Sequence, residues 1–236
     1  MHVLITRPRH QTEATAAALA ELGHTCSIEP PLEIRELQTA FPNGSFDGLI
    51  LTSSNALPAM QNLIAQRKFD PLPVLTTGKA SAEAAEQFGF KQVDYVVGSA
   101  LDLVKQLPEW MAQHGLNGPL VYPCAESTAH DLGALLSAKD ISCTHWPVYC
   151  SSPTSQFTET TKKALKAKKF DGVLLYSKRT AHTFVQLMQQ DDISMVDLHV
   201  YLMSYDIFNA LPKELQANAH YPDKPTEAGL LNLIGL

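Results

Sequence analysis

Short apolar runs bounded by turn residues recur along the chain, and a segment with helical spacing follows most of them. Two of the runs are near copies, Phe46–Ser53 (FDGLILTS) and Phe170–Ser177 (FDGVLLYS). Neither alternates apolar and polar positions, which is typical of a strand covered on both faces of a sheet. Helical patterns follow at Ala56–Ile64 and Ala181–Met188. The pattern predicts strand–helix units with parallel strands, and therefore an α/β protein.

The similarity between the two halves of the chain extends in both directions and keeps its order. The further aligned pairs are Thr25–Ser27 with Ser142–Thr144, Leu72–Gly78 with Leu198–Ser204, and Gly98-Ser99 with Pro225-Thr226. The first of these pairs follows an opening strand and an Ala/Leu-rich helical segment in both halves. Because ordered self-similarity indicates a repeated structural unit, we predict two tandem copies of one four-part unit.

Two extended segments stand out from the strand–helix pattern. His24–Leu37 is long for a single strand, and Pro30-Pro31 makes it unsuited to a helix. Cys143–Pro153 is a second proline-interrupted stretch of the same kind. Each segment is a candidate crossing between two domains.

Length and composition describe an ordinary soluble protein. With 236 residues the chain is long enough for two domains, and it is 45% hydrophobic and 18% charged. No apolar run approaches the roughly 18 residues that a membrane span needs. The first strand, His2–Thr6, directly follows Met1 without a basic leader or an apolar export signal. We therefore expect a cytoplasmic protein with no membrane partner.

Cysteine spacing and net charge argue against two further classes. Cys26, Cys124, Cys143 and Cys150 show no C-x-x-C spacing, so neither a zinc site nor a disulfide framework is indicated. The net charge of -6 argues against a sequence-independent nucleic-acid binder, because that affinity comes from clustered Lys and Arg. We expect no metal ion and no nucleic-acid partner.

The residues just after each predicted strand, here called strand tips, are rich in Ser, Thr and Gly. In open α/β sheets ligands bind where strand tips meet helix N-termini, and unpaired N–H groups there attract anions. The tips also hold cations on an acidic chain: Arg7, Arg9, Lys79, Lys178, Arg179 and Lys224. The pattern favours an anionic ligand with several carboxylates. The alternative is that tip residues such as Ser53, Ser99, Ser127 and Thr226 only cap helices.

Other catalytic signatures are missing. The chain has neither G-x-G-x-x-G after its first strand nor G-x-x-x-x-G-K-[ST], and no G-x-S-x-G or H-E-x-x-H. Tyr149 is singled out because it lies in the second extended segment, at a candidate domain junction. A phenol with the ordinary pKa of about 10 stays protonated at neutral pH and can act as an acid. The alternative is a tyrosine that only packs at the junction.

A set of short motifs occurs in a fixed order along nearly the whole chain. They are VLITRP (Val3–Pro8), LTSSNA (Leu51–Ala56), GKASA (Gly78–Ala82), YPC (Tyr122–Cys124), PVY (Pro147–Tyr149) and KPT (Lys224–Thr226), with the two FDG turns. In these motifs the chain resembles the uroporphyrinogen-III synthase family. Each motif is short and degenerate, and the ordered set is fairly specific.

The resemblance implies a particular domain organisation. The fold expected is two flavodoxin-like, parallel-sheet domains joined by a two-stranded ribbon, with an active-site cleft between them. Domain 1 would be discontinuous, residues 1–35 plus 152–236, and domain 2 would span 38–148. The ribbon would lie near 30–38 and 146–153. The repeat alone favours a contiguous division instead, whereas the two extended segments favour the crossing.

The resemblance also implies an activity. The family cyclises the linear tetrapyrrole hydroxymethylbilane to uroporphyrinogen III, inverts ring D and releases water. The implied enzyme is a lyase of haem biosynthesis that acts as a monomer and uses no cofactor. The implied steps are loss of the terminal hydroxyl to give an azafulvene, attack through a spiro-pyrrolenine, and ring closure. The enzyme chiefly holds a flexible polyanion in one reactive geometry.

Candidate site residues follow from the tips and the resemblance together. Tyr149 matches the family's candidate acid, and Ser53, Ser81, Ser177 and Thr226 match family positions near the substrate. The full set of candidate substrate-binding residues is Arg7, Thr52, Ser53, Lys79, Ser81, Ser99, Cys124, Ala125, Ser177, Lys178, Arg179 and Thr226.

The chain departs from the family pattern in its second half. Where a Gly-x-T-T-like tip is usual, it has Ser204–Ile207, which places the carboxylate of Asp206 beside a polyanion site. Lys178-Arg179 follows Ser177 where smaller residues are common. A rival hypothesis from a different class is a non-catalytic two-domain protein that binds an anionic ligand. Replacing Tyr149 by Phe distinguishes the two, because only an enzyme has a rate to lose.

Overall fold

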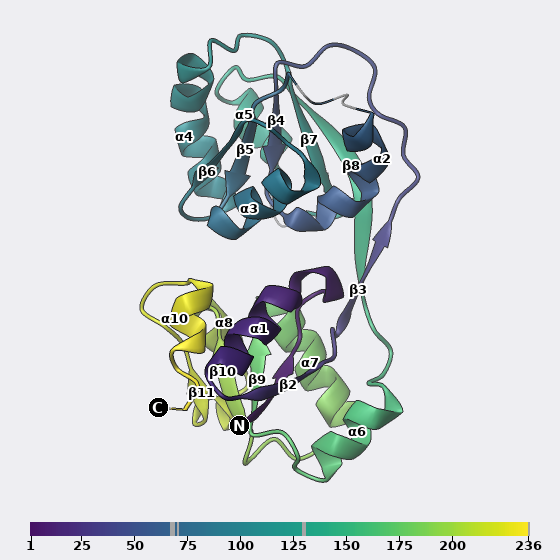
Figure 1. Ribbon diagram of the computed structural model, residues 1–236, viewed down its shortest axis with the longest axis vertical. Helices are drawn as coiled ribbons and strands as arrows, with labels where there is room; N and C mark the ends of the chain where they lie inside the picture. Colours follow the sequence, from purple (N-terminus) through teal and green to yellow (C-terminus); the bar gives the residue numbers. More distant parts are fainter. Residues whose placement is uncertain (67–68, 70, 129–130, 236) are drawn as a thin grey trace. The chain divides into compact units, whose positions relative to one another are not determined.

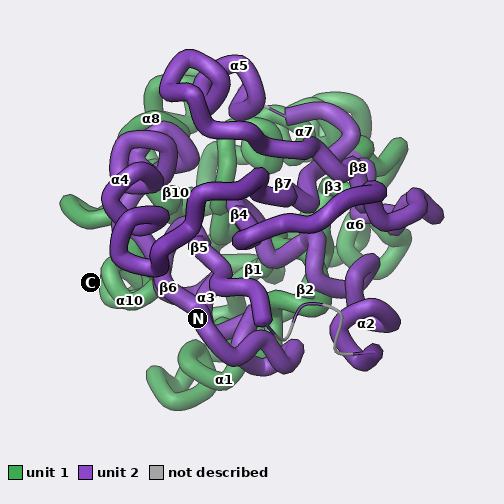
Figure 2. The backbone as a smooth tube through the Cα atoms, turned by 90° about the horizontal axis from the view of Figure 1, so that it is seen from above, with its two compact units in different colours: residues 1–33, 152–236 green, residues 34–151 purple. Residues whose placement is uncertain are grey.

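A computed structural model describes residues 1–66, 69, 71–128 and 131–235. The chain divides into two compact units, which Figure 2 shows in separate colours. Unit 1 comprises residues 1–33 and 152–236, and unit 2 comprises residues 34–151. Each unit holds one sheet with helices on both of its faces (Figure 1). The predicted α/β class with parallel sheets is confirmed.

Unit 1 holds a five-stranded sheet in the order β11-β10-β9-β1-β2, and every pair in it is parallel. The central strands are buried throughout or nearly so, as their non-alternating apolar runs predict. The strands are β1 (His2–Ile5), β2 (Thr25–Ile28), β9 (Gly172–Leu175), β10 (His199–Leu202) and β11 (Ala219–His220).

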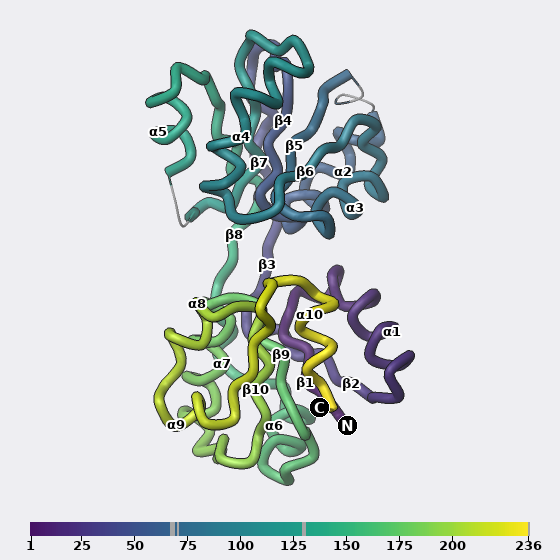
Figure 3. Tube along the Cα trace, turned by 90° about the vertical axis from the view of Figure 1, so that its left-hand side faces the viewer, coloured from purple at the N-terminus to yellow at the C-terminus, as the bar shows by residue number. Residues whose placement is uncertain are grey.

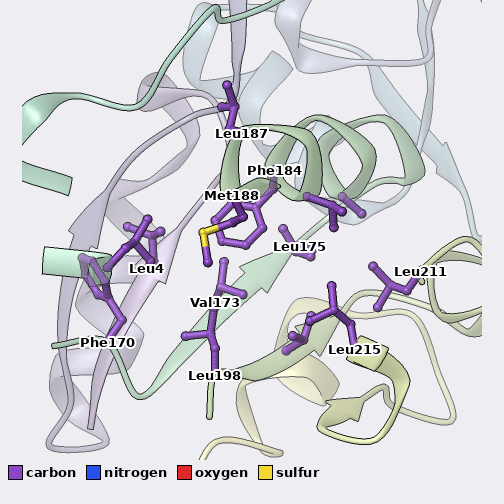
Figure 4. Close-up of a cluster of buried hydrophobic side chains, with 14 of the residues drawn as sticks. Leu4, Phe170, Val173, Leu175, Phe184, Leu187, Met188, Leu198, Leu211 and Leu215 are labelled. Atoms are coloured by element: carbon purple, nitrogen blue, oxygen red, sulfur yellow. The ribbon is translucent and has the colours of Figure 1, made fainter. Parts of the chain in front are cut away.

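The helices of unit 1 cover the sheet from both sides. One face packs against α1 (Glu13–Glu21) and α10 (Glu227–Leu231) through Leu19 and Leu230. The other face packs against the longest helix of the unit, α7 (Lys178–Gln190), whose Phe184 and Met188 lie over β9 (Figure 4). The same face carries α6 (Glu159–Lys166), α8 (Tyr205–Phe208) and α9 (Lys213–Gln216), and a 3-10 turn at Arg9–Gln11 precedes α1.

Unit 2 holds a six-stranded sheet in the order β3-β8-β7-β4-β5-β6. One face packs against α2 (Leu57–Ala65) and α3 (Lys79–Phe88), and the other against α4 (Ala100–Gln113) and α5 (Leu132–Ser137). A 3-10 turn, Ser54–Ala56, precedes α2. The strands are β3 (Leu32–Glu36), β4 (Gly48–Leu51), β5 (Val74–Thr77), β6 (Val93–Val96), β7 (Leu120–Ala125) and β8 (Cys143–Pro153).

The two extended, proline-interrupted segments pair with each other. Strand β3 lies beside β8, and the boundary between the units falls within both strands. The amide of Leu37 donates to the carbonyl of Val148 at 2.8 Å, and that of Thr154 donates to Pro31 at 2.9 Å. Because residue numbers rise along one segment and fall along the other, this ribbon is antiparallel.

The tandem repeat takes an unexpected form in the fold. Unit 1 has the strand order 2-1-3-4-5 of flavodoxin-like sheets when its own strands are counted along the chain. Unit 2 has the same order if β7 and β8 are counted before β4, β5 and β6. The first copy in the sequence therefore supplies β1 and β2 to one sheet and β4 to β6 to the other. The second copy does the reverse, so the copies exchange their later halves.

Two predicted tips are shorter in the structure than expected. Helix α3 begins at Lys79 and α7 at Lys178, so Lys79, Ser81, Lys178 and Arg179 lie in first helical turns rather than in loops. Strand β7 continues to Ala125, so the candidates Cys124 and Ala125 lie within a strand rather than after it. Strand β4 pairs only with the first two residues of β7, and beyond them β7 pairs with β8 alone. Pro123 lies in this second part, where its missing N–H removes no hydrogen bond to β4.

Candidate active site

A pocket of about 220 Å³ opens in unit 2 where the carboxyl ends of its central strands meet. Thr52 directly follows β4, Ala125 ends β7, and Tyr149 lies opposite Ala125 on β8. The parallel strands bring these three positions to one edge, which is where open α/β sheets bind ligands. The pocket is lined by Thr52, Ala100, Tyr122, Ala125, Ser127, Thr128, Leu132 and Tyr149.

A hydrogen bond between two side chains orders one wall of the pocket. The hydroxyl of Thr52 and the phenol of Tyr122 are 2.8 Å apart. Thr52 is fixed in turn through its carbonyl, which accepts a hydrogen bond from the Thr77 hydroxyl at 3.0 Å. Burial raises the pKa of Tyr122 to about 12. The phenol therefore stays neutral across the physiological range and acts only as a hydrogen-bonding group.

Tyr149 is held on a rigid element. Its backbone carbonyl accepts a hydrogen bond from the amide of Glu126 at 2.8 Å, which ties β8 to the end of β7. Its side chain is mostly buried and packs with the core on the α2 and α3 face. Tyr149 also lines the pocket, together with Thr52 and Tyr122. Two tyrosines and a threonine thus border one small pocket.

Two other candidate residues of unit 2 cap helices. The Ser53 hydroxyl accepts from the amide of Asn55 at 3.2 Å and begins the 3-10 turn before α2. Ser99 caps α4 in a capping box with Asp102, whose carboxylate accepts from the Ser99 amide at 2.9 Å. These hydrogen bonds hold the pKa of Asp102 far below its usual range. Both hydroxyls therefore have a structural task at the carboxyl edge of the sheet.

The remaining unit 2 candidates differ in accessibility. Lys79 is well exposed and pairs with Glu83 at 3.2 Å, one turn along α3. Ser81 is half-buried in the same helix. Cys124 lies inside β7, and its thiol packs in the core on the α4 and α5 face. Burial raises the pKa of the Cys124 thiol to about 11, so it is neither a nucleophile nor an anion at neutral pH.

Arg7 follows β1 in unit 1 and already has a carboxylate partner within the chain. Its Nη1 donates to Glu227 Oε2 at 2.7 Å and to the Thr15 hydroxyl at 3.0 Å. The guanidinium lies over the ring of Tyr176, 4.6 Å from the centroid. The Tyr176 phenol and the Thr15 hydroxyl both donate to Glu227 Oε1, at 3.2 and 2.5 Å. This cluster joins the tip of β1 to the first turn of α10.

The other unit 1 candidates lie at the carboxyl ends of β9 and β11. The Ser177 hydroxyl accepts from the amide of Thr180 at 3.1 Å and caps α7. Lys178 and Arg179 follow it on the exposed side of that helix. Thr226 caps α10, accepting from the amide of Gly229 at 3.1 Å, as its sequence context predicts. Asp131 rather than Ser127 caps α5, where its carboxylate accepts from Ala134 at 3.0 Å.

Tyr122 and Glu227 are site residues that the candidate set lacks. Tyr122 appears in the sequence only within a motif, and its partner Thr52 lies 70 residues away. Glu227 reads as an ordinary first-turn acid beside the Thr226 cap, although its partner Arg7 lies 220 residues away. No local signal distinguishes either residue, because each role depends on a contact between residues that are far apart in the sequence.

The described residues include no helix long and apolar enough to cross a membrane. Within the same ranges, no group of three or more His, Cys, Asp or Glu side chains is arranged to hold a metal ion. The four cysteines are free thiols. The side chains at the two sheet edges offer hydroxyls, phenols, cations and carboxylates.

Comparisons with known proteins agree on one family. Residues 13–232 match the model of the family described as uroporphyrinogen-III synthase HemD. The uroporphyrinogen-III synthase of Synechococcus elongatus is 27% identical over 200 residues, which is 79% of this chain and 74% of that protein.

Two solved structures share the fold over almost the whole chain. The uroporphyrinogen-III synthetase of Helicobacter pylori 26695 has a TM-score of 0.66 at 15% identity and covers 98% of this chain and 97% of its own. A mutant uroporphyrinogen III synthase of the extremely thermophilic bacterium Thermus thermophilus has a TM-score of 0.57 at 14% identity, with coverages of 99% and 96%. Because the family model matches most of its length, the chain belongs to the uroporphyrinogen-III synthase family.

Proposed function

We propose that this protein converts hydroxymethylbilane into uroporphyrinogen III, inverting ring D and releasing water. The observation that carries the proposal is the pocket at the carboxyl edge of the unit 2 sheet, where Tyr149, Tyr122 and Thr52 converge in a member of this family. The pocket offers neutral proton donors in a largely apolar setting. That is the environment in which loss of a hydroxyl group as water is assisted without a metal ion.

Tyr149 is the proposed general acid. Its phenol donates a proton to the terminal hydroxyl of the substrate as the carbon–oxygen bond breaks, so water leaves and a protonated azafulvene remains. After ring closure through the spiro intermediate, a pyrrole carbon loses a proton, which balances the proton donated at the start. The reaction has no net change in oxidation state, so it requires no redox cofactor.

Tyr122 and Thr52 are proposed to orient the reacting end of the substrate. Their hydroxyls are 2.8 Å apart, so one donates a hydrogen bond to the other. The accepting hydroxyl still carries its own hydrogen, which it can donate to a ligand in the pocket. With its pKa raised to about 12, Tyr122 stays protonated and serves as a hydrogen-bonding group. The apolar residues Ala100, Ala125 and Leu132 limit the number of waters able to quench the azafulvene.

The sheet edges of both units are proposed to bind the substrate's eight carboxylates. Helices α4 and α7 begin at these edges with Ser99 and Ser177 as caps, and their free N–H groups attract anions. Lys79, Lys178 and Arg179 add exposed positive charge. Ser53, Ser81 and Thr226 enter the proposal through the family resemblance. Arg7 contributes to the proposed binding of carboxylates only indirectly, because its guanidinium already forms a salt bridge with Glu227.

The test is a coupled assay that supplies freshly made hydroxymethylbilane and separates the type I and type III isomers after oxidation. Type I forms without an enzyme, so the isomer ratio is the informative quantity. We expect predominantly type III. Type I alone, from protein shown to be folded, would reject the catalytic assignment and leave a binding protein for an anionic ligand. We further expect a monomer in the cytoplasm, which light scattering and cell fractionation test.

A further inference from the structure

An exposed group of three aromatic rings lies at the carboxyl edge of the unit 1 sheet. Tyr205 is the first residue of α8, three residues after β10 ends, and Tyr221 directly follows β11. Phe208 closes the same turn of helix as Tyr205. Figure 3 shows α8 following β10. We call Tyr205, Phe208 and Tyr221 the aromatic triad. Strands β10 and β11 are parallel neighbours, so both tyrosines belong to one edge.

The triad is a packed group whose outer rings remain open to solvent. Centroids of Tyr205 and Phe208 are 6.0 Å apart with nearly parallel planes, and Tyr221 lies 5.3 and 5.2 Å from the two rings. Phe208 packs against the buried core of the unit and anchors the group. Tyr205 and Tyr221 are 54% and 38% exposed. Large rings held in place yet exposed at a ligand-binding edge indicate a binding surface.

Charge beside the triad indicates what kind of ligand it takes. Lys178 starts α7 at the tip of the neighbouring strand, and its Nζ lies 3.7 Å from Asp206 Oδ2. Both side chains are more than half exposed, so this is a weak surface pair. A ligand carboxylate can therefore take the place of Asp206 at Lys178. The surface combines an aromatic platform with an exchangeable cation, which suits an aromatic ring bearing carboxylate side chains.

We propose that the aromatic triad binds one pyrrole ring of the linear tetrapyrrole, while Lys178 binds a carboxylate of that ring. The inference rests on the proposed function and adds a subsite to it. An electron-rich ring stacks on Tyr205 or Tyr221 in an offset or edge-on arrangement, as aromatic groups do generally. Asp206 opposes binding through repulsion and through its hold on Lys178. Asp206 thus weakens the attraction of this edge for anions, and stacking on the aromatic triad contributes to recognition of the substrate there.

The test measures KM and kcat for type III formation in four variants. Tyr205→Ala and Tyr221→Ala each raise KM about tenfold, the scale of losing one stacked aromatic contact, and leave kcat nearly unchanged. Tyr205→Phe keeps the ring and retains the parent KM. Asp206→Asn lowers KM up to about fivefold, because it frees Lys178 and removes a like charge.

Val196→Ala is the matched control. Val196 is 72% exposed in the same unit, but it precedes the amino end of β10, so its loss leaves KM and kcat unchanged. Melting temperatures of all variants are recorded in parallel. An unchanged KM in both alanine variants overturns the subsite. A fall in kcat and melting temperature at constant KM also overturns it, because it shows a purely structural role.

A separate arm distinguishes failure of the subsite from failure of the proposed function. If the parent protein forms no type III isomer, the enzymatic proposal fails, and binding is then measured directly with porphobilinogen. This probe is a single pyrrole with acetate and propionate groups. We expect it to shift the proton NMR signals of the Tyr205 and Tyr221 rings in the parent, and to bind more weakly to Tyr205→Ala. Absence of any shift at millimolar concentrations overturns the subsite as well.

Discussion

The carboxyl edges of the two sheets share one strand order and differ in chemistry. In unit 2 the pocket at this edge is lined by neutral groups, among them Thr52, Tyr122 and Tyr149, while the charged Lys79 and Asp102 lie outside the pocket in the first turns of α3 and α4. In unit 1 the edge holds ions, with Arg7 bound to Glu227 and Lys178 beside Asp206. The same scaffold thus places the proposed proton donor, Tyr149, at a neutral pocket in one unit and two charge pairs at the sheet edge of the other.

Under the proposed function, this difference divides proton transfer and substrate recognition between the two units. A neutral phenol in an apolar pocket suits proton transfer, because nearby charges would alter the proton affinity of the reacting groups. Charged side chains suit recognition of a polyanion, but they must be held apart or neutralised when the ligand is absent. Unit 1 does this with internal carboxylates, Glu227 and Asp206. The predictions below test each half of this division.

The largest effect is expected at Tyr149. Tyr149→Phe removes the proposed acid and lowers kcat about 100- to 10,000-fold, the range for losing a general acid, while KM stays close to that of the parent. Steady-state formation of type III isomer measures both constants. Tyr122→Phe is the control, since it also removes one phenol hydroxyl from the pocket but leaves the acid. If the two variants lose the same rate, Tyr149 only fills space.

The second prediction concerns the charge pair of unit 1. Glu227→Gln weakens the hold on the Arg7 guanidinium and destabilises the contact between the β1 tip and α10 by about 1.5 to 3 kcal/mol, the value of a hydrogen bond to a charged group. Hydrogen exchange of the α1 and α10 amides measures this locally. We expect faster exchange there and unchanged exchange in α4 of unit 2.

Asp197→Asn provides the matched comparison for that pair. Asp197 binds Lys168 at 2.5 Å in the same unit, but both side chains are more than 60% exposed. Its loss is expected to cost about 0 to 1 kcal/mol. Equal effects of the two substitutions would show that the Arg7 pair is an ordinary surface contact and carries no positioning role.

Much of the fold follows from local pattern. Strands β4 and β9 lie inside the two predicted apolar runs, Phe46–Ser53 and Phe170–Ser177, and β1 matches the predicted strand His2–Thr6 to within one residue, because a strand buried on both faces has no polar interruption. Helix starts are predicted less well. The first turns of α3 and α7 carry Lys79, Ser81, Lys178 and Arg179 on exposed or half-buried positions, so they lack the apolar spacing that marks a helix.

Long-range pairing is the part that the sequence leaves open. The repeat aligns β1 with β7 and β4 with β9, but either pairing of the halves buries the same apolar residues. Thr52 and Tyr149 are predicted site residues that the structure brings to one pocket. Arg7 is predicted as a substrate-binding cation, whereas in the structure Glu227 from the far end of the chain is its partner. Neither the shared pocket nor the salt bridge can be predicted from local pattern, because each joins residues that are distant in the sequence.

A smaller effect is expected at the helix caps, and it separates capping from substrate contact. Ser177→Ala removes the acceptor for the Thr180 amide and destabilises unit 1 by about 1 kcal/mol. Ser177→Asn restores that stability, because Asn caps helices as well as Ser does. If the hydroxyl also contacts substrate, KM stays raised in the Asn variant. Full recovery of KM would assign Ser177 to capping alone, and the same pair of variants at Ser99 tests unit 2.

The last prediction concerns Tyr122, whose titration affects stability only at high pH. Its pKa is raised from about 10 in the unfolded chain to about 12 in the fold, so the folded protein keeps a proton that the unfolded chain releases above pH 10. Stability therefore falls as pH rises from 10 to 12, because the unfolded state binds fewer protons. In Tyr122→Phe this fall is shallower, although the variant is slightly less stable at pH 7 through the lost Thr52 hydrogen bond.

Thermal melts at pH 9 to 12 measure the difference, with Tyr95→Phe, whose ring is 46% exposed in the same unit, as the control. Parallel curves for Tyr122→Phe and the parent would mean that the phenol titrates as it does in water. The unit 2 pocket would then be wet, and the contrast between a neutral, apolar edge and a charged one would fail.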